Sequence, residues 1–280
     1  MRIIRDTEIT DVIERLFLKA NKVLSPDLEK CIRDARNKET SPLAASILDS
    51  LSDNLDAARQ LDVPICQDTG IAVVFCDIGA DIHIDGNLTD AINEGVRRAY
   101  LGGHLRLSVV KDPLFNRVNT SDNTPAIVHV RIVEGDKITL TAVPKGFGSE
   151  NKSALKMFTP SATPTDIVNF VCETVIKAGG DPCPPLVIGV GVGGDFEYAP
   201  LLAKRALVRE TAVPHPEESW AQLETDTLKA VNETGVGVQG FGGSTTALDV
   251  HYEYAPTHIA GLPVAVNIGC HVTRHASETL

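Results

Sequence analysis

The spacing of apolar residues predicts that the chain begins with helices. Over residues 8–60 the apolar side chains recur at the period of an amphipathic helix. Ser25-Pro26 and Ser41-Pro42 each place a capping residue before a proline at the first helical position. The pattern therefore predicts three helices between residues 8 and 60.

After residue 60 the pattern predicts strands mixed with helices. The strand-like runs are 71–78, 105–110, 126–133, 137–143, 186–192, 246–254 and 262–268, and the helix-like runs are 88–101, 164–178, 200–208 and 217–233. Glu134-Gly135-Asp136, between two of the strand-like runs, predicts a β-hairpin. We expect an α+β fold in a single unit, residues 1–280. Its helical N-terminal layer, residues 1–60, should pack on mixed sheets formed by residues 61–280.

Composition narrows the classes of protein that fit this pattern. With 43% apolar and 5% aromatic residues, the core should be aliphatic. The net charge of −11 disfavours a nucleic-acid or anionic-membrane surface, but allows a local basic pocket for a small anion. The sequence has neither a membrane-length apolar stretch nor a hydrophobic signal core at its N-terminus. We therefore expect a cytoplasmic protein.

The six cysteines divide into two groups by their surroundings. Three lie inside helix-like or strand-like runs and are predicted to be core thiols: Cys31, Cys76 and Cys172. Three lie beside Pro or Gly at the ends of such runs: Cys66, Cys183 and Cys270. Disulfides are rare in the cytosol, so these six are expected to be thiols or metal ligands. Backbone N–H groups in turns stabilise a thiolate, which favours the second group as ligands.

The spacing of the cysteines alone leaves two interpretations open. There is no Cys-x-x-Cys pair, so the three turn cysteines could be isolated thiols. Alternatively they could hold a metal cluster. Three thiolates would then leave one metal position for a substrate, which favours Lewis-acid chemistry over electron transfer.

A glycine-rich motif offers a competing hypothesis of nucleotide binding. Residues 189–194 satisfy G-x-G-x-x-G after a predicted strand. However, Asp195 and Glu197 place negative charge where a pyrophosphate would meet the following helix. Residues 235–240 satisfy the same pattern. Tight backbone packing is therefore the favoured interpretation of these glycines.

Three further candidates remain open on the residues alone. The loop Lys145–Lys152 could bind an anion through its backbone N–H groups and lysines, or could simply leave a hairpin. Gln67 and Asp68 could be catalytic or could cap the turn that contains Cys66. His258 is one of eight dispersed histidines, and a single histidine is more often structural.

Several separated motifs together resemble the class I, iron–sulfur fumarases. The similarity is to the alpha subunit of the two-subunit form, with the tartrate dehydratase alpha subunit as a close relative. It covers nearly the whole chain. The residues that carry it are Pro64-Ile65-Cys66-Gln67-Asp68-Thr69-Gly70, Leu105-Arg106, Lys145–Lys152, Cys183-Pro184-Pro185, Ala255-Pro256-Thr257-His258 and Cys270-His271.

The resemblance implies a cofactor and a reaction. It implies the N-terminal catalytic domain fold of that family and a [4Fe–4S] cluster ligated by Cys66, Cys183 and Cys270, with one iron that no cysteine ligates. The implied reaction is the hydration of fumarate to L-malate, a step of the tricarboxylic acid cycle. L-tartrate dehydratase and mesaconate hydratase are the alternatives within this class. A non-enzymatic iron–sulfur or redox protein is an alternative from another class.

The resemblance also assigns roles to individual residues. Gln67, Asp68, Arg106, Gly146 and Lys145 match positions that contact the dicarboxylate substrate. Asp68 is the implied proton donor to the departing hydroxyl, and His258 is expected to orient the substrate or Asp68. The chain departs from the family at Phe147, where another glycine is common.

One expectation concerns a partner. Single-chain members of the family carry a further C-terminal domain that supplies the catalytic base and more cationic residues. This chain ends at Leu280, soon after Cys270. The resemblance therefore implies a separate beta subunit that completes the active site, in an α2β2 assembly.

Overall fold

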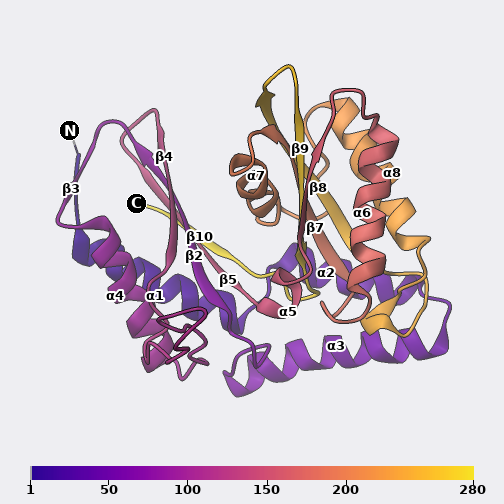
Figure 1. Cartoon of the computed structure of the whole chain (residues 1–280). Helices are drawn as coiled ribbons and strands as arrows, with labels where there is room; N and C mark the ends of the chain where they lie inside the picture. The colour runs from indigo at the N-terminus through magenta and orange to yellow at the C-terminus, as the bar shows by residue number, and fades with distance from the viewer. Residues whose placement is uncertain (1) are drawn as a thin grey trace. The chain divides into compact units, whose positions relative to one another are not determined.

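The computed structural model describes residues 2–280, which form two compact units (Figure 1). Unit 1 comprises residues 2–25, 55–147 and 274–280, and unit 2 comprises residues 26–54 and 148–273. Both units contain helices and a mixed sheet, so the predicted α+β class is confirmed. The N-terminal helices do not belong to one unit, since α1 lies in unit 1 and α2 in unit 2. That the whole chain acts as a single domain stays a prediction.

Unit 1 is built around a four-stranded sheet. Its elements are β1 (Arg2–Arg5), α1 (Asp6–Lys22), β2 (Ile71–Gly79), β3 (Ile82–Asp85), α4 (Leu88–Gly102), β4 (Ile127–Val133), β5 (Ile138–Lys145) and β10 (Ala276–Thr279). The strand order is β10-β5-β2-β4, and β1 pairs with β3 in a separate two-stranded sheet. Helix α3 (Pro42–Leu61) contributes residues to both units.

The central position of β2 contradicts the predicted hairpin. β4 and β5 are joined by the Glu134-Gly135-Asp136 turn but do not pair, because β2 lies between them, parallel to β4 and antiparallel to β5. The sequence Ile71–Cys76 is apolar on both faces, as a central buried strand requires. The turn instead bonds to the connection that follows β2, since Asp81 N donates to the Gly135 carbonyl.

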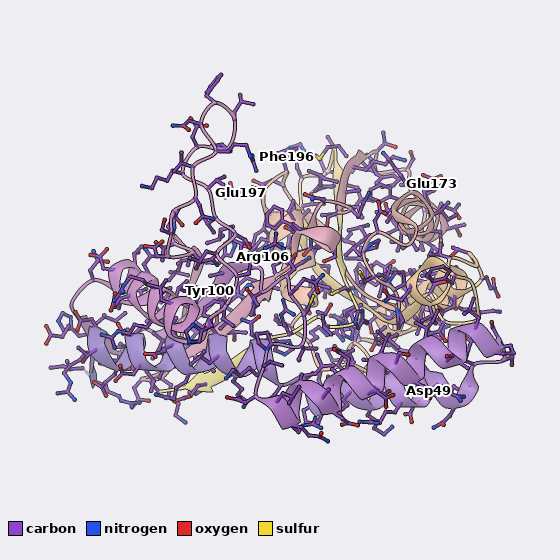
Figure 2. The ribbon with its side chains drawn as sticks, turned by 90° about the horizontal axis from the view of Figure 1, so that it is seen from below. Asp49, Tyr100, Arg106, Glu173, Phe196 and Glu197 are labelled. Atoms are coloured by element: carbon purple, nitrogen blue, oxygen red, sulfur yellow. The ribbon has the colours of Figure 1, made fainter. Side chains whose placement is uncertain are left out.

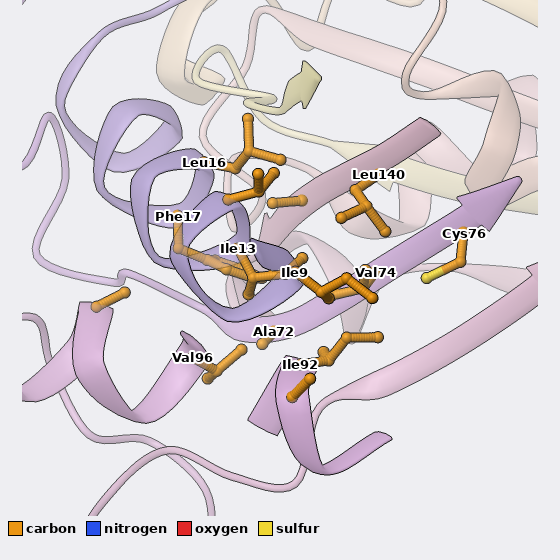
Figure 3. Packing of buried hydrophobic residues seen from close by; sticks show 14 of the residues in the cluster. Ile9, Ile13, Leu16, Phe17, Ala72, Val74, Cys76, Ile92, Val96 and Leu140 are labelled. Atoms are coloured by element: carbon orange, nitrogen blue, oxygen red, sulfur yellow. The ribbon is translucent and has the colours of Figure 1, made fainter. Parts of the chain in front are cut away.

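The core of unit 1 is aliphatic, as the composition predicts. Helix α1 contributes one face, with Ile9, Ile13, Leu16 and Phe17 directed towards the sheet (Figure 3). The residues that meet this face are Ala72, Val74 and Cys76 of β2, Leu140 of β5, and Ile92 and Val96 of α4. Cys76 is fully buried in this cluster, in agreement with its prediction as a core thiol.

Unit 2 contains a second mixed sheet with helices on both faces. Its elements are α2 (Pro26–Lys38), β6 (Ala154–Phe158), α6 (Pro164–Ala178), β7 (Leu186–Gly194), α7 (Tyr198–Ala206), α8 (Glu218–Asn232), a 3-10 turn (Val238–Gly240), β8 (Ala247–Thr257) and β9 (Leu262–Gly269). The short helix α5 (Phe147–Glu150) begins where unit 1 ends. The strand order is β6-β9-β7-β8. Helix α7 lies on one side of this sheet, and α6 and α8 lie on the other (Figure 1).

The glycine-rich motif of β7 is explained by helix packing. A Cβ atom at Gly189 would lie 2.1 Å from the Ala203 carbonyl oxygen, and one at Gly191 would lie 2.0 Å from that of Ala199. These glycines let α7 rest directly on the strand. Asp195 Oδ1 accepts hydrogen bonds from two amides at the start of α7, those of Glu197 and Tyr198. The helix terminus that would bind a phosphate already has a carboxylate, which supports packing over nucleotide binding.

The other predicted elements match the structure with one exception. Helices α1, α2 and α3 confirm the three predicted helices, and Pro26 and Pro42 are the first residues of α2 and α3 as expected. Residues 105–110 were predicted to be a strand, which is wrong. Two of their amides bond to side chains instead, Arg106 N to Thr69 Oγ1 and Ser108 N to Asn123 Oδ1, and Val110 forms an isolated bridge with Asn119. Of the elements in residues 2–280, no helix combines the length and apolar character that crossing a bilayer requires.

Candidate active site

The turn that contains Cys66 is held by buried side chains from three distant parts of unit 1. Arg274 Nη2 donates to the Asp68 carbonyl, and the Tyr100 hydroxyl lies 2.7 Å from the Thr69 carbonyl oxygen and 3.1 Å from that of Gly70. Asn123 Nδ2 also donates to the Gly70 carbonyl, at 3.1 Å. Three successive carbonyls are therefore fixed from within the protein. This leaves the preceding residues of the turn to face outwards.

The side chains that hold the turn are themselves buried. Arg274 is 4% exposed, Tyr100 1% and Asn123 0%. Gly70 adopts φ +76°, and a Cβ at this position would lie 2.7 Å from the backbone of Lys145. Only glycine fits such a close approach in this conformation. The turn is thus rigid, which is what a site that must hold reactive groups in place requires.

Asp68 links the turn to the glycine loop. Its Oδ1 accepts the Gly70 amide and its Oδ2 accepts the Phe147 amide, each at 3.0 Å. A Cβ on Gly146 would lie 3.1 Å from Oδ2, so the glycine allows the carboxylate to approach the loop. The departure from the family at Phe147 leaves this contact intact, because the amide is used and the aromatic side chain is 47% exposed.

The other residues predicted to contact substrate in unit 1 differ in exposure. Gln67 is exposed, and its Oε1 lies 3.6 Å from Cys66 Sγ. Arg106 lies in the loop after α4, the helix that contains Tyr100 (both residues are labelled in Figure 2), and its side chain is exposed. Lys145 is only 5% exposed and its Nζ lies 3.4 Å from the Gly146 carbonyl oxygen. Gln67 and Arg106 are accessible to a ligand, whereas Lys145 supports the loop from within.

Cys183 and Cys270 come together in unit 2. Cys183 precedes β7 and Cys270 follows β9, and Val187 pairs with Gly269 in the antiparallel ladder of these strands. Both cysteines therefore lie at the same end of the sheet. Cys183 has φ +56°, and its carbonyl accepts the His271 amide at 3.3 Å. The two segments are bonded to each other directly.

A third loop supports the Cys183 segment. Gln239 Nε2 and the Gln239 amide both donate to the Pro184 carbonyl, at 2.6 and 2.9 Å. His271 Nδ1 lies 3.0 Å from the Cys183 carbonyl oxygen, which requires a proton on that nitrogen. A Cβ on Gly237 would collide with the backbone of Gly242 at 2.0 Å. The second glycine-rich motif is thus a tight turn that supports a cysteine loop.

His258 lies away from this end of the sheet. It sits in the exposed connection between β8 and β9, and its Nδ1 accepts the Ala260 amide at 3.1 Å. Thr257 pairs with Gly194, the last residue of β7, whereas Cys183 precedes the first. Within unit 2 the length of the sheet therefore separates His258 from Cys183 and Cys270. His258 borders instead a hollow of about 530 Å³ with Asp195 and Tyr198.

Two of the remaining cysteines have surroundings that disfavour metal ligation. Burial raises the pKa of the Cys31 thiol, in α2, and of the Cys172 thiol, in α6. A raised thiol pKa disfavours the thiolate that ligation requires. The prediction of core thiols is confirmed for Cys76 alone among the three, since Cys31 and Cys172 are only half-buried. Cys66 and Cys270 are half-buried as well, Cys183 is exposed, and no disulfide forms in residues 2–280. The chemical character of Cys66, Cys183 and Cys270 fits thiolate ligands better than that of the other three.

The structure does not by itself gather a metal site. No group of three or more His, Cys, Asp or Glu side chains within residues 2–280 is arranged to hold a metal ion. Cys66 belongs to unit 1, and Cys183 and Cys270 belong to unit 2. A cluster shared by these three residues stays a prediction.

Four supporting residues were missed by sequence reasoning. They are Tyr100, Asn123, Gln239 and Arg274. Tyr100 reads as a buried helix residue, and Asn123 and Gln239 read as loop residues. Only Arg274 carries a signal, a single arginine close behind Cys270 in an otherwise uncharged segment. Their contacts bridge 30 or more residues of sequence, so no local pattern reveals them.

Comparison with known proteins identifies relatives over the whole chain. The family model described as fumarate hydratase (Fumerase) matches residues 10–279. A protein from Methanocaldococcus jannaschii, provisionally named L(+)-tartrate dehydratase subunit alpha, is 40% identical over 280 residues, covering 98% of each chain. The L(+)-tartrate dehydratase alpha subunits of Escherichia coli and Shigella sonnei are each 28% identical over 274 residues, covering 96% of this chain and 90% of theirs.

Proposed function

Because the chain belongs to the fumarate hydratase (Fumerase) family, we propose that it is the cluster-bearing alpha subunit of an iron–sulfur hydro-lyase that acts on a four-carbon dicarboxylate. The first candidate reaction is the reversible hydration of fumarate to L-malate. The observation that carries the proposal is the Cys66 turn. Its fixed backbone presents Cys66, Gln67 and Asp68 next to one another on one edge of unit 1.

The proposed cofactor is a [4Fe–4S] cluster held by Cys66, Cys183 and Cys270, with one iron that no cysteine ligates. Such an iron acts as a Lewis acid that lowers the barrier to loss of a hydroxyl group from the substrate. The support for these ligands is their position in turns and the raised pKa of the Cys31 and Cys172 thiols. The three proposed ligands remain to be tested by variants.

The residues of this chain have separable roles in the proposed reaction. The exposed guanidinium of Arg106 has no partner within residues 2–280, so it is available to bind a substrate carboxylate. The exposed amide of Gln67, which follows Cys66 directly, can orient the substrate. Asp68 is the proposed proton donor to the departing hydroxyl. Its two backbone contacts hold the carboxylate in a fixed direction, as a general acid requires.

A second subunit is part of the proposal. The relatives are named as alpha subunits, which implies a beta partner. In the proposed complex the partner supplies the catalytic base and further carboxylate-binding groups, in an α2β2 assembly. His258 is exposed and distant from Cys183 and Cys270 within unit 2. Its proposed role in orienting the substrate would therefore be filled only in an assembled complex.

The names of the relatives favour a second candidate reaction. These relatives are named for L(+)-tartrate dehydration, which removes water from a substrate with one more hydroxyl group. The residues of this chain that face the substrate would bind either dicarboxylate. The choice between fumarate, L-tartrate and mesaconate then depends on the partner's groups as well.

Anaerobic reconstitution of the chain with iron, sulfide and a co-expressed beta subunit tests the proposal. The complex should be brown and should convert one of fumarate, L-tartrate or mesaconate. A direct competition among the three substrates gives the ratios of their kcat/KM values and so ranks them. The alpha chain alone should bind iron without turnover. An iron-replete complex that converts none of the three, and whose cluster spectrum is unchanged by them, would instead support a non-enzymatic redox protein.

A further inference from the structure

Arg274 is a buried cation that forms no ion pair with any residue in the part of the chain that the structure describes. It is 4% exposed, and its Nη2 donates to the Asp68 carbonyl. Its Nε and Nη1 are shielded from solvent and have no hydrogen-bond partner within residues 2–280. Buried guanidinium groups are normally paired with carboxylates. A departure from this rule calls for a specific reason at this position.

The field of this cation reaches the other side chains that hold the turn. Burial raises the pKa of the Tyr100 hydroxyl far above its ordinary value; the positive charge of Arg274 opposes that rise, and the negative charge of Asp68 adds to it. The same hydroxyl contacts the Thr69 and Gly70 carbonyls. The guanidinium of Arg274 is therefore bonded to the backbone of the Cys66 turn, and its charge also acts on the hydroxyl that contacts this backbone.

The position of Arg274 along the chain is also constrained. It follows Cys270 by four residues and is the first residue of unit 1 after the chain leaves unit 2. Two residues later the chain enters β10, in which Ala276 pairs with Ala142 of β5. The backbone that follows Arg274 is thus held in the sheet of unit 1. Its side chain therefore joins the start of the last segment of unit 1 to the Cys66 turn.

We propose that Arg274 is a positioning residue of the candidate active site, which holds the Asp68 carbonyl and places a buried guanidinium beside the Cys66–Asp68 turn. The ligands expected at this turn, a thiolate and a dicarboxylate, are anions, so a buried cation next to the turn favours them. The assignment rests on the proposed function for its role in turnover. The hydrogen bond from Arg274 to the Asp68 carbonyl, which we call the clamp on the turn, does not depend on the proposed function.

Three variants separate the two parts of this assignment. Arg274→Met removes both the charge and the donors at similar length. Arg274→Gln keeps a donor without charge, and Arg274→Lys keeps the charge and a donor. Arg131→Met is the control, because Arg131 is an exposed arginine of the same unit whose guanidinium pairs with Asp77 at a distance from the turn along the sequence. All four are made in the reconstituted complex.

The first readout is hydrogen exchange of the amides of residues 66–70, which does not depend on catalysis. Loss of the clamp in Arg274→Met should raise their exchange by about tenfold or more, since the turn opens locally. The second readout is the split of kcat from KM. Misplacement of Asp68 should lower kcat by about 100-fold, with a smaller change in KM. Arg274→Lys should recover exchange protection and most of kcat, and Arg131→Met should match the wild type.

The outcomes are distinguishable from failure of the proposed function. If the wild-type complex turns over no dicarboxylate, the exchange data still decide whether Arg274 holds the turn. Wild-type exchange and wild-type kcat in Arg274→Met would overturn the assignment. Should Arg274→Met not fold, Arg274→Gln and Arg274→Lys carry the comparison. Equal, wild-type behaviour of both would overturn it as well.

Discussion

Asp68 shows how a single side chain can serve both the fold and the proposed chemistry. Its carboxylate accepts two backbone amides, and its carbonyl accepts Arg274. A residue that only capped a turn would need the first amide alone. The additional contact with Phe147 directs the second oxygen towards the glycine loop. The capping and catalytic interpretations are therefore compatible at this residue.

Replacement of Asp68 by asparagine tests its role as the acid. Asp68→Asn should retain iron and lower kcat by about 10²-fold to 10⁴-fold, the range that general acid catalysis contributes. Iron content and steady-state rates of the complex are the measurements. Asp112→Asn is a matched control, because Asp112 also accepts two backbone amides in unit 1. Near wild-type rates in Asp68→Asn would remove it as the acid.

Replacement of single cysteines tests the division of the thiols. Cys66→Ser should lose bound iron while the far-ultraviolet circular dichroism stays the same, since Cys66 lies in a turn and is not part of the buried core. Cys31→Ala should keep its iron, because burial raises the pKa of the Cys31 thiol. The iron content of the two purified variants shows which of the two cysteines is needed to bind iron. Loss of iron in Cys31→Ala alone would reverse the division.

At the scale of elements, glycine-rich strands and buried caps set how closely helices approach their neighbours. Gly189 and Gly191 let α7 lie against β7, and Glu39 joins the end of α2 to the start of α3. Neither feature touches a proposed ligand. The glycines belong to β7, the strand that Cys183 precedes.

Addition of a methyl group at Gly191 should destabilise unit 2. The new Cβ would lie 2.0 Å from the Ala199 carbonyl oxygen, so α7 or β7 must move. Gly191→Ala should lower the free energy of unfolding by about 1–3 kcal/mol, the usual cost of overpacking. Urea denaturation measures it. Gly261→Ala is the control, since nothing lies within 4 Å of its Cβ, and equal stabilities of the two variants would contradict the packing argument.

Glu39 should give a pH-dependent contribution to stability. Its carboxylate accepts the amides of Thr40, Ser41 and Ser244 and the hydroxyl of Ser244, at 2.8–3.0 Å. Burial alone would raise its pKa, but these hydrogen bonds outweigh burial, and the pKa lies below its usual value of 4.5. Because the folded-state pKa is depressed, the stabilisation is complete above the unfolded pKa. It is lost as the pH falls through the folded pKa.

The pH dependence of Glu39→Gln checks this linkage. At pH 7 the variant should be less stable by about 1–3 kcal/mol, the range for hydrogen bonds to a charged group. The difference from the wild type should stay constant above about pH 5 and shrink at lower pH. Urea midpoints at several pH values give the curve. A difference that grows on acidification would contradict the sign.

At the scale of the whole molecule, each unit has a core of its own that does not depend on the proposed cofactor. The two main clusters of buried residues lie within unit 1 and unit 2, and none of Cys66, Cys183 and Cys270 is buried. The proposed cluster would draw its ligands from both units. It should therefore govern activity far more than folding.

Removal of iron tests this separation. A chelator under anaerobic conditions should abolish activity of the complex while helix and strand content are retained, in contrast to small domains that fold only around a metal. Circular dichroism and activity are followed on the same sample. Readdition of iron and sulfide should restore turnover. Global unfolding on chelation would show that the cluster is structural.

The sequence by itself determined the features that depend on local pattern. Periodicity and Ser-Pro pairs located the N-terminal helices, and Pro and Gly neighbours separated the turn cysteines from Cys31, Cys76 and Cys172. The order of several motifs was specific enough to identify the family. Such features are encoded within a few residues of one another, where propensity and capping act.

Only the tertiary structure decided which distant segments meet. The apolar β2 lies between β4 and β5, so the expected hairpin does not form. Within residues 105–110, the Arg106 and Ser108 amides donate to the side chains of Thr69 and Asn123 in place of a strand partner. Arg274 reaches Asp68 across 206 residues. These outcomes depend on competition between distant groups for burial and hydrogen bonds, and that competition leaves no periodic trace in the sequence.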